Sequence, residues 1–345
     1  MIISFNTVVV SFYIAPALLS VIFLPMLGYS LDDFAVQSIL LSVVSVLCGL
    51  LLGNVLVPNY KVIINFGESR GLIYIKEGML LIGLLGYVVG IAKVGGLPAF
   101  QGGDSRVLMS NGPHWSLFYV GMCSFLIKLK KVEIPRRRLY LYIFIYFLFC
   151  FFSGWKATVV NLVFILAIHR LKVFGISIKA ILLSTLIFMM MFFIVNFFRG
   201  GMTGINLMEP IFYSIFGFYN YSFIASGSYP DCLYSLSVVS GCKFVFDNAL
   251  LPIPTWNVYT ALTPLYIDGG DRYIGVYFLL AGFFLSVSAR IKNSIFLNFV
   301  YFTSVVFFFY AHNGYLFDSN IYYILAIFFM FFDFIRYKSR VNGAL

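Results

Sequence analysis

Charged side chains are scarce in this chain: 10% of its 345 residues are Asp, Glu, Lys or Arg, against about 25% in soluble domains. This scarcity excludes an ordinary water-soluble fold, because 61% hydrophobic residues need a bilayer as solvent. Histidine is almost absent, with only His114, His169 and His312, which argues against a His-rich metal site. The sequence also lacks P-loop, CxxC, HExxH and GxSxG motifs, and therefore indicates none of the chemistries that those motifs carry.

Long apolar runs are what the sequence has instead. Runs of about 18 or more apolar residues can cross roughly 30 Å of hydrocarbon as helices, and the alternation of a membrane β-barrel is missing. We therefore predict an all-α, polytopic integral membrane protein that forms a single domain over 1–345. The first run has neither a basic n-region nor a cleavage site, so we expect it to be retained as a helix. The ten predicted spans are 7–28, 34–57, 72–94, 114–130, 139–154, 157–171, 177–198, 272–289, 294–311 and 320–337.

Basic residues predict the orientation of these spans. Seventeen of the 23 Lys and Arg residues fall in five clusters that share one side of the membrane if both termini are inside. We expect a multi-pass protein of the bacterial inner membrane with cytoplasmic termini. The net charge of +10 then reflects topology and attraction to anionic membrane lipid, and no nucleic-acid partner is expected. The clusters are Lys61, Arg70 and Lys76; Lys128, Lys130, Lys131, Arg136, Arg137 and Arg138; Arg170, Lys172 and Lys179; Arg290 and Lys292; and Arg336, Lys338 and Arg340.

The same topology places a long outer loop at 199–271. An alternative topology counts its segment 211–225 as an eleventh span, which would move the last two basic clusters to the outside. The segment also contains Asn220 and Ser222, so we expect a short interfacial helix there. Its aromatic rings could stack on sugars or form an interfacial belt.

Two of the five cysteines lie in this loop, ten positions apart. If the loop faces an oxidising compartment, Cys232 and Cys242 are expected to form a disulfide; the alternative is two free thiols. The other three, Cys48, Cys123 and Cys150, fall within apolar runs and are expected to be packing residues.

Cations outside the five clusters are candidates for binding an anion at the outer side. Arg106 follows a glycine-rich loop that also holds Asp104, and the ordinary alternative is a flexible turn with a solvated Asp–Arg pair. Arg199 precedes two glycines at the start of the long loop, and Lys156 lies in the turn between two short spans. Either side chain could instead simply reach the membrane surface.

The end of the long loop holds the densest group of candidates. Trp256 and Tyr259 are followed by the sequence Asp268-Gly269-Gly270-Asp271-Arg272. Asp268 could act as a base, with Arg272 close by and a helix N-terminus that favours anions. The alternative is that Asp268 only caps the helix that follows.

Three segments resemble the oligosaccharide repeat-unit polymerase family, the O-antigen or Wzy-type polymerases. They are the Gly-Gly-Leu-Pro-Ala-Phe loop before Arg106, the Ser-Gly-Trp-Lys turn that ends at Lys156, and the stretch from Asn257-Val-Tyr-Thr through Asp268-Gly-Gly to Gly275. The number of spans and a large outer loop in the second half also resemble this family. O-antigen ligases are similar, and there the turn that holds Lys156 carries an Arg or a Lys.

The resemblance implies a glycosyltransferase that needs no metal or other cofactor. Its substrate would be an undecaprenyl-diphosphate-linked oligosaccharide on the periplasmic side, and a chain-length regulator and a flippase would be its partners. The growing chain would be transferred from its lipid diphosphate to the non-reducing end of the next unit. The candidate catalytic residues are Asp268, Arg199 and Arg106, and the candidate substrate-binding residues are Lys156, Arg272, His114, Asp104, Glu209, Trp256 and Tyr259.

Two other functions stay open at this point. An O-antigen ligase would carry out the same chemistry with a lipid A-core acceptor. A flippase or transporter would carry out no chemistry, and would be expected to have about twelve or more spans in two related halves.

Overall fold

The computed structural model describes residues 5–57, 71–98, 113–126, 134–153, 162–163, 166, 186, 190, 209–235, 240, 260–290, 294–311 and 320–342. All regular elements in these ranges are helices, as predicted. The chain divides into two compact units. Unit 1 comprises Met1–Ile63, Asn206–Ile291 and Val300–Tyr323, and unit 2 comprises Ile64–Ile205, Lys292–Phe299 and Ile324–Leu345.

Four of the described helices are long and apolar enough to cross a membrane. They are α1 (Phe5–Met26), α2 (Asp33–Leu56), α3 (Gly71–Val94) and α11 (Leu262–Arg290). The predicted helices at 7–28, 34–57 and 72–94 are thus confirmed to within two residues, whereas 157–171 and 177–198 lie outside the described residues except for isolated positions. The other helical elements are α5 (Pro113–Cys123), η2 (Ser124–Leu126), α6 (Arg136–Phe152), α9 (Glu209–Ala225), α12 (Ile295–Tyr310) and α13 (Asn320–Asn342).

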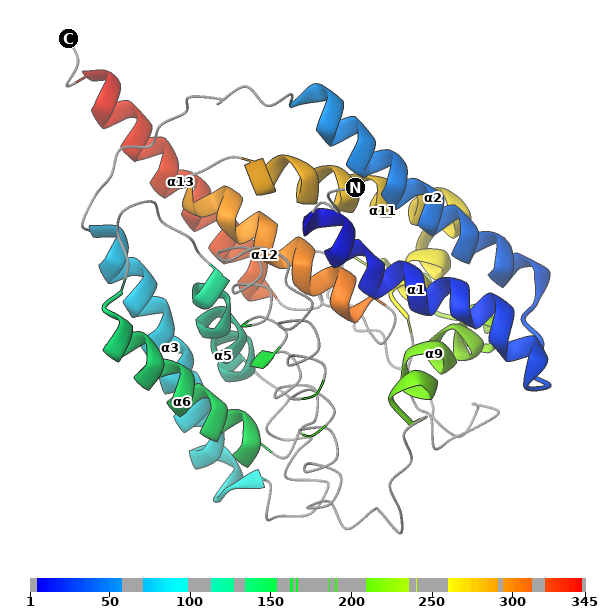
Figure 1. Ribbon diagram of the computed structural model, residues 1–345, viewed down its shortest axis with the longest axis horizontal. Coiled ribbons are helices and arrows are strands. Elements are labelled where there is room, and N and C mark those ends of the chain that lie inside the picture. The colour runs from blue at the N-terminus through cyan, green and yellow to red at the C-terminus, as the bar shows by residue number, and fades with distance from the viewer. Residues whose placement is uncertain are drawn as a thin grey trace. The chain divides into compact units, whose positions relative to one another are not determined.

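Helices α2 and α11 pack side by side in unit 1 with their backbones in direct contact (Figure 1). A Cβ atom added at Gly49 would overlap the carbonyl oxygen of Leu279, and one added at Gly282 would lie 2.5 Å from the carbonyl oxygen of Val46. Side chains larger than hydrogen would therefore push the helices apart. Small residues at such a crossing let membrane helices approach closely and gain van der Waals contact. This packing matters because the hydrophobic effect does not drive helices together within lipid.

The two helices run in the same direction. Near their beginnings the Ser38 hydroxyl donates to the Asp271 carboxylate at 2.5 Å. Near their ends Arg290 donates to the Asn54 carbonyl oxygen at 3.0 Å, and Ser286 donates to the Asn54 side-chain oxygen at 2.9 Å. Because both helices start at the same end of unit 1, the chain between them must return to that end.

Two glycines interrupt α11 near its start. Gly269 has φ −168° and ψ 21°, and Gly270 has φ 62° and ψ −152°. The positive φ at Gly270 is a conformation that residues with a Cβ atom rarely adopt. The glycines separate a short first segment, which carries Asp268, from the long helix that follows. The long helix after the break therefore begins at Asp271 and ends at Arg290, within one residue of the predicted span 272–289, whereas the short helical segment from Leu262 was not predicted.

Helix α9 lies in the predicted outer loop and packs against the end of α1 (Figure 1). Its Ile215, Phe216 and Tyr219 form an apolar cluster with Leu24 of α1. This agrees with a short helix in the loop, and α9 is not among the four span-length helices. Phe216 is only 4% exposed, so its ring belongs to the core and has no free face for a sugar.

Unit 2 contains a group of three packed helices. Helix α3 contacts both α5 and α6. The Tyr146 hydroxyl of α6 donates to the Leu80 carbonyl oxygen of α3 at 2.8 Å, and the rings of Tyr87 and Phe149 stack with their centroids 4.5 Å apart. Aromatic packing and one buried hydroxyl therefore hold α6 on α3.

The α2–α11 contact predicts a stability difference between two glycine variants. Gly49→Ala is expected to lower the free energy of unfolding by about 1–3 kcal/mol, because its Cβ atom meets backbone that can move only if the helices separate. Gly275→Ala is the control on the same helix pair, since its Cβ atom would meet Leu41 and Ser45 at an ordinary 3.7 Å. Thermal unfolding in detergent measures both, and equal midpoints would contradict the close contact.

Candidate functional site

A pocket of about 540 Å³ opens at the end of unit 1 where α2 and α11 begin. Its volume falls in the range of roughly 300–1,000 Å³ that is usual for small-molecule sites. The pocket is lined by the end of α9, the segment after it and the first segment of α11. Its polar lining residues are Tyr229, Asp231, Cys232, Tyr266 and Asp268.

Asp268 fastens the segment that follows α9 to α11. Its Oδ1 atom accepts the backbone N–H of Tyr234 at 2.7 Å, and its Oδ2 atom accepts the backbone N–H of Ser235 at 2.6 Å. Hydrogen bonds to a charged acceptor contribute about 1.5–3 kcal/mol each. These bonds hold a distant segment rather than the start of the following helix, and each carboxylate oxygen already has one donor.

Tyr229 ties the same segment to the end of α9. Its hydroxyl donates to the Ile224 carbonyl oxygen at 2.7 Å, and its ring packs edge-on against Tyr234 with centroids 6.2 Å apart. Burial, and secondarily the neighbouring Tyr234, raise the pKa of the Tyr229 phenol above its ordinary value. The hydroxyl therefore stays protonated at neutral pH.

A covalent link also restrains this wall of the pocket. Cys232 is disulfide-bonded. Cys242, its expected partner, lies outside the described residues, so the predicted pairing stays a prediction. Ser240 additionally donates its hydroxyl to the Leu233 carbonyl oxygen at 2.7 Å. The segment from 229 to 235 is thus held by side-chain hydrogen bonds and a disulfide without belonging to a helix.

Tyr266 connects the pocket to the core of unit 1. Its ring centroid lies 5.3 Å from that of Phe34 on α2 and 5.8 Å from that of Tyr221 on α9. Tyr221 is fully buried, whereas Tyr266 is partly exposed where it lines the pocket. The three rings fix the side of the pocket that Tyr266 forms, because each is restrained by a different helix.

The other predicted residues of α11 lie beyond the glycine break. Asp271 is occupied by its hydrogen bond from Ser38, and Arg272 is exposed. Neither lines the pocket. Asp268 and Arg272 are therefore close in sequence, but the break at Gly269 and Gly270 separates their helical segments.

Of the remaining predicted site residues only two are described, and they lie in different units. His114 is 6% exposed at the start of α5 in unit 2, and Glu209 is the first residue of α9 in unit 1. The others fall outside the described residues: Asp104, Arg106, Lys156, Arg199, Trp256 and Tyr259.

Sequence reasoning missed Asp231 and Tyr229, which the structure brings to the pocket. The signal was present in Tyr229-Pro230-Asp231-Cys232, a proline-containing segment beside a cysteine that was expected to be in a disulfide. Asp231 is exposed and has no hydrogen-bond or ion-pair partner among the described residues. It differs in this respect from Asp268 at the same pocket.

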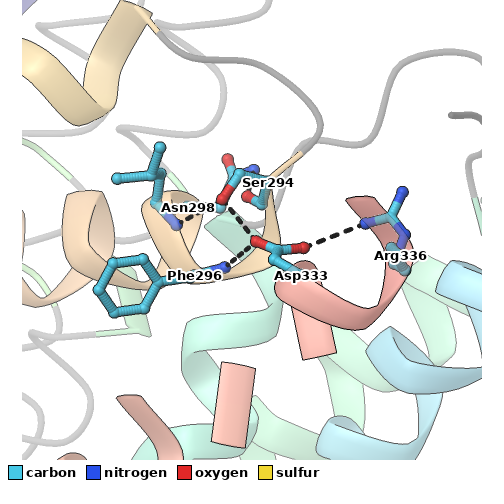
Figure 2. Close-up of polar contacts among 6 residues, drawn as sticks. Ser294, Phe296, Asn298, Asp333 and Arg336 are labelled. Carbon is cyan, nitrogen blue, oxygen red and sulfur yellow. Dashed lines mark hydrogen bonds and ion pairs between the residues drawn. The ribbon is translucent and has the colours of Figure 1, made fainter. Parts of the chain in front are cut away.

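Asp333 of α13 is a second carboxylate that sequence reasoning missed, and it lies in unit 2. It accepts the Ser294 hydroxyl at 2.6 Å, the Phe296 N–H at 3.0 Å and the Arg336 guanidinium at 3.2 Å, and these contacts are drawn in Figure 2. Ser294 in turn caps α12, since its Oγ atom accepts the Leu297 N–H at 2.9 Å. The signal was an acidic residue inside an otherwise apolar run. This 4%-exposed carboxylate joins the start of α12 to α13.

The pocket in unit 1 is chemically suited to bind hydroxyl groups. Its described lining offers carboxylate oxygens and tyrosine rings and contains no Lys or Arg. Carboxylates accept hydrogen bonds from hydroxyls, and aromatic faces pack on the apolar faces of sugar rings. Among the described residues, no group of three His, Cys, Asp or Glu side chains could hold a metal ion.

Comparison of the chain with protein-family models, with curated proteins and with solved structures finds no match. The class that the described structure defines is a helical, multi-pass membrane protein.

The two bonds of Asp268 predict an effect on hydrogen exchange. Asp268→Asn is expected to speed exchange of the Tyr234 and Ser235 amides by about ten- to a hundred-fold, because an uncharged amide offers only one acceptor oxygen. Asp271→Asn serves as the matched control, since that carboxylate bonds Ser38 instead. Hydrogen exchange followed by mass spectrometry measures both variants. Unchanged protection at 234–235 in Asp268→Asn would mean that other contacts hold this segment.

The Asp333 cluster predicts a loss of stability. Asp333→Ala removes the acceptor of three donors and leaves Arg336 without its carboxylate, so the free energy of unfolding is expected to fall by about 3–5 kcal/mol. Glu77→Ala breaks the 3.5 Å ion pair with the largely exposed Arg138, and should cost under about 1 kcal/mol. Denaturation in detergent compares the two, and equal losses would exclude a special contribution from Asp333.

Proposed function

We propose that the chain is an inner-membrane glycosyltransferase that polymerises undecaprenyl-diphosphate-linked oligosaccharide units on the periplasmic side. The observation that carries this proposal is the pocket built on Asp268. It combines hydroxyl-binding groups with a location at one end of two membrane-length helices. The resemblance of three sequence segments to repeat-unit polymerases supports the same function.

The direction of α2 and α11 supports an outer position for the pocket. The stretch from Asp271 to Arg290 covers about 30 Å at 1.5 Å per residue, the thickness of a bilayer core. Arg290 lies at the end opposite the pocket and bonds the backbone of Asn54 and Val57. Basic residues favour the cytoplasmic side. The predicted ten-span topology also has spans two and eight crossing in the same direction, with both termini inside.

The reaction needs little beyond alignment and charge stabilisation. The oxygen of an acceptor hydroxyl forms a bond to the anomeric carbon of the growing chain, and the bond from that carbon to the phosphate oxygen breaks. The electron pair leaves with undecaprenyl diphosphate, and the hydroxyl proton passes to a base. The candidate cations stabilise the leaving group, and the pocket orients the acceptor. These cations are Arg106, Lys156, Arg199 and Arg272.

The glycan profile of a deletion strain tests the function. Loss of the chain is expected to leave single capped repeat units on the cell surface. Free lipid-linked polymer would indicate a ligase instead, and units trapped in the cytoplasm would indicate a flippase. Either profile would overturn the polymerase proposal.

Complementation of that strain tests the outer cations. Replacing Arg106, Lys156, Arg199 or Arg272 with Ala is expected to shorten or abolish the polymer, because each loss weakens binding of the diphosphate. Arg137→Ala is the matched control, since Arg137 is exposed and belongs to a predicted cytoplasmic cluster. Gel analysis of the surface glycan measures chain length. Full-length polymer from all four variants would contradict the role of these cations.

A further inference from the structure

The described lining of the pocket does not suit the diphosphate that the proposed reaction releases. Two carboxylates, those of Asp231 and Asp268, contribute negative charge, and no Lys or Arg opposes them in the described lining. A diphosphate is itself an anion, so both carboxylates would repel it from this pocket. The described lining therefore favours a neutral or positively charged group that donates hydrogen bonds.

The two carboxylates of the pocket are used differently. Both oxygens of Asp268 accept backbone N–H groups from Tyr234 and Ser235. Asp231 is exposed and has no partner among the described residues, although it lies on the same restrained segment. The hydrogen bonds of Asp268 hold the segment that presents Asp231, so Asp268 acts as a positioning residue. Asp231 is the carboxylate available to a ligand.

The rest of the lining matches a sugar ring. Tyr229 and Tyr266 offer aromatic surface, and their positions are fixed by a hydrogen bond to Ile224 and by ring contacts with Phe34 and Tyr221. Sugars present apolar faces to such rings and hydroxyls to carboxylates. A metal ion is less well suited, because Cys232 of the lining is disulfide-bonded and no group of three acidic, His or Cys side chains among the described residues could hold one.

We infer that this pocket binds an uncharged sugar of the acceptor unit, with Asp231 accepting a hydrogen bond from one of its hydroxyls. The inference deepens the proposed function. That the bound sugar belongs to the acceptor unit rests on the proposed function, whereas the binding of a sugar does not. The lipid diphosphate then binds elsewhere, at cations outside this lining.

A binding experiment tests the inference on the purified full chain in nanodiscs. The probes are the diphosphate-free neutral oligosaccharide released by mild acid from the polyprenyl-linked intermediates of the host cell, and inorganic pyrophosphate. Saturation-transfer NMR and titration measure affinity. Asp231→Asn is expected to weaken oligosaccharide binding about ten- to a hundred-fold, the effect of losing one charge-assisted hydrogen bond. Pyrophosphate binding should stay unchanged or improve, because a negative charge is removed.

Two controls make the result specific. Asp33→Asn replaces an exposed carboxylate in the first turn of α2, outside the pocket lining, and is expected to bind the oligosaccharide like the wild type. Hydrogen exchange at Tyr234 and Ser235 reports whether Asp231→Asn keeps the segment in place. Protection should be the same as in the wild type, since these amides bond Asp268.

The outcomes separate this inference from the polymerase proposal. Equal oligosaccharide affinity in wild type and Asp231→Asn, no binding by the wild type, or weaker pyrophosphate binding in Asp231→Asn would overturn the sugar pocket. If oligosaccharide binding depends on Asp231 but the deletion strain still makes full-length polymer, the pocket stands and the polymerase fails. If the deletion strain loses its polymer but the variant binds normally, the polymerase stands and the role of Asp231 fails.

Discussion

The backbone contact between α2 and α11 is the constraint on which the rest of unit 1 depends. Gly49 and Gly282 let the helices approach until side chains would no longer fit between them. This approach brings Ser38 to Asp271, just past the break at Gly270. The first segment of α11 is thereby directed toward α9 and the segment after it, where the pocket forms. The glycine break in α11 and the packing of α2 on α11 thus together determine where the pocket forms.

Three of the described carboxylates join one segment of the chain to another. Asp268 ties the segment after α9 to α11, Asp271 ties α11 to α2, and Asp333 ties α12 to α13. Each gives hydroxyl or N–H donors a partner. Asp333 is buried, where water cannot easily replace a lost partner, which makes the loss of that carboxylate costly. Asp231 differs from these three because it lines the pocket without a protein donor among the described residues. The Asp231 carboxylate can therefore accept a hydrogen bond from a ligand, whereas the other three already accept hydrogen bonds from the protein.

The sequence predicts the apolar helices well and the site only in part. Runs such as those of α1, α2 and α3 are long enough that hydropathy alone defines them. Asp268 was identified from its place beside two glycines, but its partners at 234 and 235 come from a loop whose path no local pattern specifies. The helical segment before Gly269 was missed because a Gly-Gly pair suggests a turn. Asp333 was missed because its role depends on Ser294, which lies 39 positions away.

The distance in sequence between α2 and α11 has a consequence for biogenesis. Ser38 and Asp271 are 233 positions apart, so α2 enters the bilayer long before its partner has been synthesised. During that interval its glycine-lined face has only lipid or transient neighbours to contact. The pocket can form only after the chain has been synthesised through Asp268, and a product truncated before that residue would insert its first helices without assembling the pocket.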